Sequence, residues 1–335
     1  MRVFGHAAYA DRADLPNKLA IPYALVYHKD YPAQLSYTET FKLMEKDVDE
    51  ALALLKYDPI HANTLLSASS KLEMNRDGFY DKRNKHLNYY AVKALQARMY
   101  AWQGGAKMQL AAAAAEEVIE QSPVQLLKDN QVIDQDKTIL SEHIFGLSVA
   151  NLGSISNPLL EAISTTNYNS LRFGEAMVEE LYEVDIPTIG ATDVRFNTLL
   201  ITEPLGMVSI KLRQLNKNDI DFNTIPLMKL PEMYYIAAEY YSQNNLAKAI
   251  TLLDEVRKSR RIVQPLASNM GQADFNEELL KEYRKEFVSE GQLFFFYKRK
   301  GLKQIPNHSA TLQADDKIYM LPFPAAEVEF GNRVQ

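Results

Sequence analysis

The chain has 335 residues, 47% hydrophobic and 24% charged, which is enough to bury a sizeable core in about two domains or one large one. Its net charge of −6 excludes the strongly basic character that is typical of nucleic-acid-binding proteins. The absence of cysteine excludes disulfide frameworks, thiolate metal sites and cysteine nucleophiles.

Helices are predicted throughout the first third of the chain. A capping-box sequence, Ser-Tyr-Thr-Glu, opens a helix over 36–55, in which apolar residues recur at helical spacing. A second helix is predicted over about 86–102 and ends at Gly104-Gly105, and a third runs over about 107–121. Because only two residues separate the second and third helices, we expect them to form an antiparallel hairpin.

A similar hairpin is predicted further along. Pro231 opens a helix, residues 244–245 make the turn, and the return helix covers about 246–261. When the two turns are aligned, Ala97 falls on Ala237. Small alanines let paired helices approach closely, which is the physical basis of tetratricopeptide-type hairpins. Two degenerate copies do not make a regular solenoid, so we expect helical hairpins embedded in a larger body.

The rest of the chain mixes loops with one strong helix. Weak periodicity over 151–224 predicts loops and short elements, and a last long helix is predicted over about 276–299. Alternating residues over 208–213 and 317–321 favour short strands. The predicted fold class is mostly α, with tetratricopeptide-like helical hairpins, long loops and a few short β-strands.

No motif for catalysis, cofactor binding or metal binding is evident. None of the six histidines has the spacing of a zinc site, so we expect them at the surface or at helix caps. Glycine-rich phosphate loops and the G-x-S-x-G elbow are absent from the sequence. Glutamates recur every fourth residue at 278, 282, 286 and 290, interleaved with lysine and arginine. This spacing favours a solvated or salt-bridged helix face over a glycosidase acid–base pair, and we expect a structural position for Glu290.

Two loops combine flat rings with polar donors, a mixture that suits stacking on a sugar ring and hydrogen bonding to its hydroxyls. One loop covers 167–173 and the other covers 77–81. The alternative is that these are ordinary aromatic residues anchoring loops. The candidate ligand-binding residues are Tyr168, Asn169, Arg172, Phe173, Phe79 and Tyr80.

Several segments resemble motifs of the SusD/RagB family. Residues 230–239 resemble its R-x-x-E-x-x-L-x-x-A-E helix, and residues 253–260 its L-N-x-V-R-x-R motif. Residues 282–292 are similar to E-R-x-x-E-L-x-x-E-G-x-R, and residues 321–328 to the closing L-P-I-P-x-x-E-I. Order and spacing agree over 36–330. Upstream likenesses cover 37–55 and 88–102.

The resemblance implies a function that composition does not show. Members of this family are surface nutrient-binding lipoproteins that carry out no catalysis. They cap a SusC-like TonB-dependent outer-membrane transporter and pass captured glycan, or in some members peptide, to it. The implied location is the cell surface at the outer membrane. The lipobox cysteine and the amino-terminal helices of the family have no counterpart here, so we expect an amino-terminally truncated member without its lipid anchor.

We therefore expect three parts. Residues 1–125 would form the first part of a SusD-like helical body, 126–228 a loop-rich insert on the ligand side, and 229–335 the C-terminal hairpin and closing segment. Glycan binding for transport is the leading hypothesis. The alternative is a tetratricopeptide-type scaffold for protein–protein interaction, which would expose its aromatic residues in the hairpin groove and not on the loops.

Overall fold

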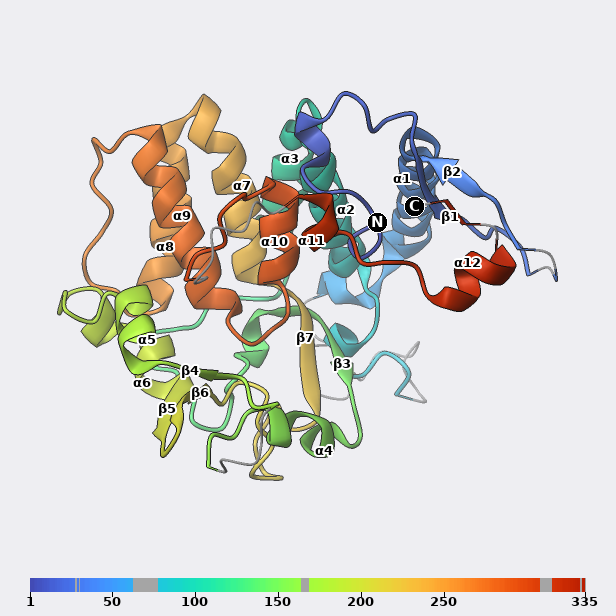
Figure 1. Cartoon of the computed structure of the whole chain (residues 1–335). Helices are drawn as coiled ribbons and strands as arrows, with labels where there is room; N and C mark the ends of the chain where they lie inside the picture. Colours follow the sequence, from blue (N-terminus) through green and yellow to red (C-terminus); the bar gives the residue numbers. More distant parts are fainter. Residues whose placement is uncertain are drawn as a thin grey trace.

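Helices dominate the computed structural model, which describes residues 1–27, 29, 31–62, 78–163, 169–307, 315–331 and 333–334 (Figure 1). No helix in these ranges is both long and apolar enough to cross a bilayer. The mostly α fold class is confirmed. The helices are α1 (Tyr37–Leu54), α2 (Tyr89–Gln103), α3 (Lys107–Gln121), α4 (Leu152–Ser156), α5 (Glu175–Tyr182), α6 (Val194–Leu199), α7 (Leu230–Asn244), α8 (Leu246–Ser259), α9 (Gln272–Phe287), α10 (Leu293–Lys300), α11 (Asp316–Tyr319) and α12 (Ala325–Gly331).

The predicted capping box opens α1. The Ser36 hydroxyl accepts from the Glu39 backbone N–H at 3.2 Å, and the Glu39 carboxylate accepts from the Ser36 backbone N–H at 3.1 Å. These two bonds satisfy amide groups that have no partner within the helix. Phe41 and Val48 then pack with Trp102 in a small core between α1 and α2.

The two predicted hairpins form the centre of the helical body. Helices α2 and α3 pair with each other, as do α7 and α8, and α3 packs against α7, so the four helices lie side by side (Figure 1). Ala97 and Ala237, which the repeat alignment superposes, are both fully buried in the same core cluster. The hairpins are confirmed, whereas their specific likeness to tetratricopeptide repeats stays a prediction.

Replacing Gly104 by alanine is expected to destabilise the fold by roughly 2–3 kcal/mol. Gly104 has φ +64°, and a Cβ there would collide with the Cβ of Ala10. The cost of the strained backbone and the cost of the steric overlap therefore add to each other and together lower the free energy of unfolding. Gly105 is the matched control, because its φ is also positive but a Cβ added there would meet no atom within 4 Å, so Gly105→Ala should cost only about 1 kcal/mol. Urea unfolding of both variants tests this, and equal losses would contradict it.

Two small sheets lie below the helices in Figure 1. Strand β3 (His143–Ser148) pairs antiparallel with β7 (Thr224–Lys229), with His143 opposite Lys229 and Ser148 opposite Thr224. The second sheet, which is also antiparallel, has three strands in the order β4 (Arg172–Phe173), β6 (Gly206–Ser209) and β5 (Leu200–Glu203). A third pair, β1 (Leu19–Pro22) and β2 (Gln34–Ser36), forms an arm near the N-terminus.

Three predicted elements differ from the structure. The helix predicted over 276–299 is two helices, α9 and α10, because Ser289 and Gly291 adopt positive φ values of 61° and 69° that a helix does not allow. The strand predicted over 317–321 is the short helix α11, whose first turn is capped by Asp315. The strand predicted over 208–213 ends at Ser209.

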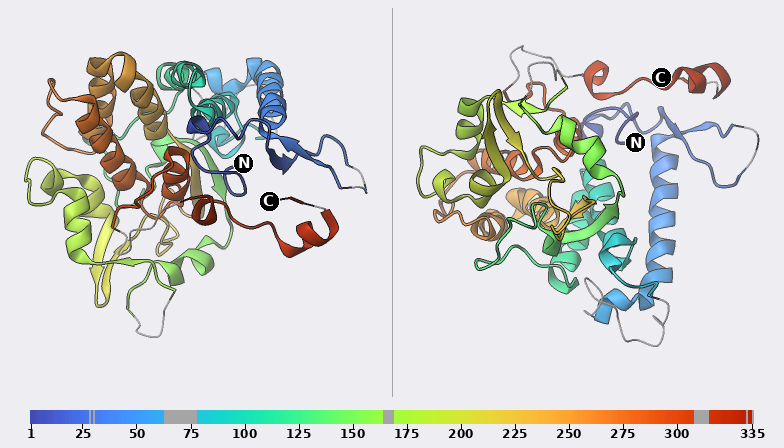
Figure 2. Two further views of the ribbon diagram at one scale, coloured as in Figure 1. Left: turned by 45° about the horizontal axis from the view of Figure 1, so that its top comes forward. Right: turned by 90° about the horizontal axis from the view of Figure 1, so that it is seen from below.

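The first residues of the chain are held by some of the last. The Ala8 backbone N–H donates to the Lys298 carbonyl at 2.9 Å, and Lys298 Nζ donates to the Arg2 carbonyl at 2.9 Å. The Ala7 backbone N–H donates to the Asp316 carboxylate at 2.9 Å. Both views in Figure 2 show the N-terminal segment beside the C-terminal helices. The two ends of the chain therefore close the fold together.

Candidate functional site

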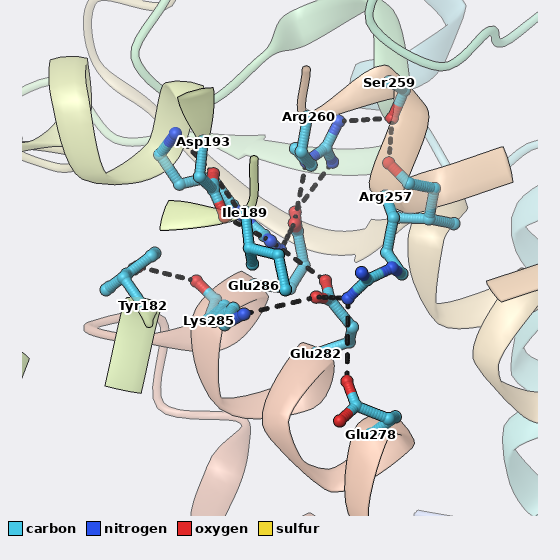
Figure 3. A network of polar contacts seen from close by, with 12 residues as sticks. Tyr182, Ile189, Asp193, Arg257, Ser259, Arg260, Glu278, Glu282, Lys285 and Glu286 are labelled. Carbon is cyan, nitrogen blue, oxygen red and sulfur yellow. Dashed lines mark hydrogen bonds and ion pairs between the residues drawn. The ribbon is translucent and has the colours of Figure 1, made fainter. Parts of the chain in front are cut away.

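Three glutamates of the predicted ladder, Glu278, Glu282 and Glu286, contact cationic side chains (Figure 3). Glu286 binds Arg260 at 2.9 and 3.0 Å, Lys229 at 2.7 Å and Arg195 at 3.2 Å. Glu282 binds Arg195 at 2.9 Å. The salt-bridged interpretation of this face is confirmed, but the solvated one is wrong at Glu282 and Glu286, because both are buried against cations from other elements.

Attraction to these cations keeps the buried carboxylates ionised. Burial alone would raise the pKa of Glu286, yet Arg260 and Lys229 hold that pKa well below its usual range. Burial likewise opposes ionisation of Glu282, but Arg195 and Lys285 lower its pKa to about 2. Both carboxylates are therefore ionised at neutral pH.

The same network joins the helical body to the loop-rich part of the chain. Arg260 follows α8 and binds Glu142, which directly precedes β3, at 2.7 Å through each of two nitrogens. Lys229 ends β7, and Lys211, which follows β6, binds Glu290 at 3.0 Å. This contact confirms the structural position expected for Glu290. Because these charges are paired and shielded from solvent, we assign the network to stability and not to ligand binding.

One histidine also differs from expectation. His143 was predicted at the surface or at a cap, but its side chain is fully buried, and its Nε2 contacts the Thr138 carbonyl at 3.0 Å. Burial lowers the pKa of His143 to about 3, with a further contribution from the charge of Lys229. Within the described ranges, no group of His, Asp or Glu is arranged to hold a metal ion.

The loop at 169–173 leads into the β4-β6-β5 sheet. Tyr168 lies outside the described residues. Asn169 and Arg172 are exposed, whereas Phe173 is half-buried and packs against the small core formed by Val178 and its neighbours. The backbone of Arg172 and Phe173 pairs with β6. Asn169 and Arg172 thus face solvent, whereas the ring of Phe173 is partly buried in the core.

The other candidate loop presents an exposed ring. The Phe79 side chain is 62% exposed and meets the ring of Tyr80 edge-on, at a centroid distance of 5.1 Å and an interplanar angle of 87°. Tyr80 lies under the Arg83 guanidinium, at 5.6 Å. Arg83 is itself buried and donates to both oxygens of Asp58 at 2.9 and 2.7 Å. Tyr80, which contacts the ring of Phe79, is therefore itself held by the Arg83–Asp58 ion pair.

The two candidate loops do not form one site. The loop that carries Phe79 leads into the 3-10 helix η5 (Arg83–Lys85), which contacts β3, whereas β4 belongs to the other sheet. Figure 1 shows these two sheets apart from each other. His86, which was not among the predicted binding residues, lies beside Phe79 at a centroid distance of 6.0 Å, and Lys82 and Lys85 lie between these two residues in the chain. Their signal was the basic run immediately after the loop.

A separate hollow runs along α8. It has a volume of about 700 Å³ and lies between α8 and the segment after it, with Ile250, Ile262 and Val263 among its lining residues. None of the candidate residues lines this hollow.

The sequence profile of the SusD family matches residues 208–322. The resemblance to the SusD family is thereby confirmed. No curated protein matches the sequence.

Solved structures extend the SusD-like fold to the whole chain. A SusD superfamily protein from Bacteroides thetaiotaomicron gives a TM-score of 0.68 at 22% identity, covering 100% of this chain and 73% of that one. A SusD-like carbohydrate-binding protein from Bacteroides vulgatus gives a TM-score of 0.68 at 16% identity, covering 99% of this chain and 72% of that one. Surface glycan-binding protein A from Bacteroides uniformis gives a TM-score of 0.59 at 16% identity, covering 98% of this chain and 70% of that one. At these identities the likeness concerns the fold.

The charged residues of the SusD-like motifs stabilise this architecture. Glu232 binds Arg98 at 2.7 Å, and Glu239 binds Arg299 at 2.6 Å. Both contacts are largely buried, like those of Glu286. These motif residues therefore hold helices together.

Proposed function

We propose that this SusD-like chain binds glycans, or other nutrient oligomers, at the cell surface without altering them chemically. The observation that carries the proposal is the SusD family match over 208–322 within a SusD-like fold that extends over the whole chain. Two structural relatives are described as carbohydrate- or glycan-binding proteins. Sites with this function need flat rings and hydrogen-bond donors at the surface, and the loops supply both.

The proposed destination of the ligand is a SusC-like TonB-dependent transporter in the outer membrane. The chain would hold a glycan, or alternatively a peptide, at its loops and pass it to that partner. Membrane attachment would be through a lipid anchor. The three-part division at 1–125, 126–228 and 229–335 belongs to the same proposal, with the loop-rich part facing the ligand.

The position of exposed rings favours glycan binding over the scaffold alternative. Among the described residues, the large exposed aromatic side chains are Tyr27, Tyr31, Tyr57, Phe79 and Phe330. None of these five lies in the hairpin helices α2, α3, α7 or α8. A scaffold that received a partner helix in the hairpin groove would expose its rings there.

Calorimetric titration against a panel of polysaccharides tests the proposal, with chromatography of the sugar after incubation. We expect saturable binding, unchanged sugar, and up to about tenfold weaker binding for Phe79→Ala, since loss of one stacked ring costs up to about 1.5 kcal/mol. Arg172→Ala tests the second loop in the same way. Phe330→Ala, which removes an exposed ring on α12, is the control and should bind normally. Sugar cleavage by the pure chain would refute the non-catalytic proposal.

A further inference from the structure

The ring of Phe79 is held in place before any ligand arrives. Its support runs from Tyr80 to the buried Arg83 and from there to Asp58, whose carboxylate also accepts from the Tyr89 backbone N–H at 3.0 Å. Tyr89 is the first residue of α2, so the support is tied to a long helix. A ring fixed in this way loses little conformational freedom when a ligand stacks on it.

Two lysines lie between this ring and His86 in the chain. Lys82 is exposed, and Lys85 Nζ donates to the Thr224 hydroxyl at 2.9 Å. Neither ammonium group forms an ion pair with a carboxylate of the described residues. Burial lowers the pKa of Lys85, and the charge of Lys82 lowers it further, although Asp221 opposes this shift.

A third cationic or hydrogen-bonding group borders the ring. The imidazole of His86 is exposed, and its centroid lies 6.0 Å from that of Phe79. Within a chain of net charge −6, this segment therefore combines a rigid apolar face with Lys82, Lys85 and His86. A ring and unpaired cations together recognise a ligand that has an apolar face and a negative group.

We propose that Phe79, Lys82, Lys85 and His86 form a subsite for an anionic sugar, in which the ring stacks on Phe79 and a carboxylate or sulfate group faces the lysines. This inference rests on the proposed glycan-binding function and adds the ligand's charge to it. The loop at 169–173 is a weaker stacking platform, because Phe173 is partly used in packing.

Two matched pairs of polymers test the subsite on the full chain. Polygalacturonate is compared with its fully methyl-esterified form, and dextran sulfate with dextran, so that within each pair only the charge differs. We expect at least tenfold tighter binding to the anionic member of one or both pairs, and the pair that responds identifies carboxylate or sulfate as the preferred group. Raising the salt concentration from 50 to 300 mM should weaken that binding severalfold.

Variants locate the binding. Lys82→Gln and Lys85→Gln should each weaken binding about threefold, and Phe79→Ala about tenfold. Lys258→Gln, which removes an exposed charge on α8, should leave binding unchanged. Charge-only adhesion of a polyanion would survive Phe79→Ala and would overturn the subsite. Equal binding of neutral and charged polymers would also overturn it while leaving the glycan-binding function intact. Binding of no polymer of either charge would overturn that function as well.

Discussion

Replacing Glu286 by glutamine is expected to lower the free energy of unfolding by about 3–5 kcal/mol at pH 7. The neutral side chain keeps the shape of glutamate but removes the main counter-charge of Lys229 and one of the two carboxylates that bind Arg260, and both cations are almost completely buried. Removing one partner of a buried ion pair is costly because the remaining charge cannot be solvated. The midpoint of urea unfolding, at an unchanged denaturant slope, measures the loss.

Glu277 on the same helix is the matched control. Its side chain is exposed, so Glu277→Gln should change the free energy of unfolding by less than about 0.5 kcal/mol. A loss below about 1 kcal/mol for Glu286→Gln would mean that Glu142 and Glu290 alone can neutralise these cations. That result would contradict the central position assigned to Glu286.

The Asp136→Asn variant is expected to lose about 2.5 kcal/mol more stability than the natural chain when the pH falls from 7 to 4, because it lacks the titration of Asp136 that in the natural chain offsets most of the loss caused by His143. Burial lowers the pKa of His143 to about 3 from an ordinary value of 6.5, so the unfolded chain takes up a proton that the folded chain refuses. Stability is therefore lost as the pH falls below 6.5. At pH 4 the penalty is about 3 kcal/mol, at 1.36 kcal/mol per pH unit.

Asp136 opposes this loss in the natural chain. Burial raises its pKa from 3.8 to about 6, so the folded chain binds a proton that the unfolded chain does not, and stability is gained between pH 6 and 3.8. Asparagine retains an oxygen for the Leu140 backbone N–H, which Asp136 accepts at 2.8 Å, but it cannot titrate. The double variant Asp136→Asn/His143→Gln lacks both titrating groups. Its stability should therefore not show the additional loss on acidification that Asp136→Asn shows. Parallel pH profiles for Asp136→Asn and the natural chain would contradict this account.

Local signals in the sequence were sufficient for much of the helical fold. The capping box at Ser36 and the Gly104-Gly105 break depend only on neighbouring residues, and both appear where they were predicted. The break between α9 and α10 was missed because Leu293 and the aromatic residues after it continue the helical periodicity across it. The short helix α11 was taken for a strand because its apolar alternation is too brief to separate the two periods.

The environment of each side chain was much harder to predict. Periodicity placed Glu282 and Glu286 on one helix face, but it could not show that Arg195 and Lys229, far away in the sequence, would cover that face. The same limit applies to the aromatic loops, because exposure of Phe79 and partial burial of Phe173 depend on distant packing. Loops that contain aromatic residues can be recognised in a sequence. Whether each ring is buried in the core or exposed at the surface cannot be predicted from it.

The joined ends of the chain have a consequence for biosynthesis. Lys298 and Asp316, which hold residues 2 and 7, follow them by 296 and 309 positions. At about 5–20 residues per second, the first segment waits roughly 15–60 s after its own synthesis before these partners exist. A ribosome-bound chain that stops short of residue 298 thus carries an amino-terminal segment without either anchor. Closure of the two ends therefore waits until residues 298 and 316 have been made, and the nascent chain depends on its earlier helices to remain folded until then.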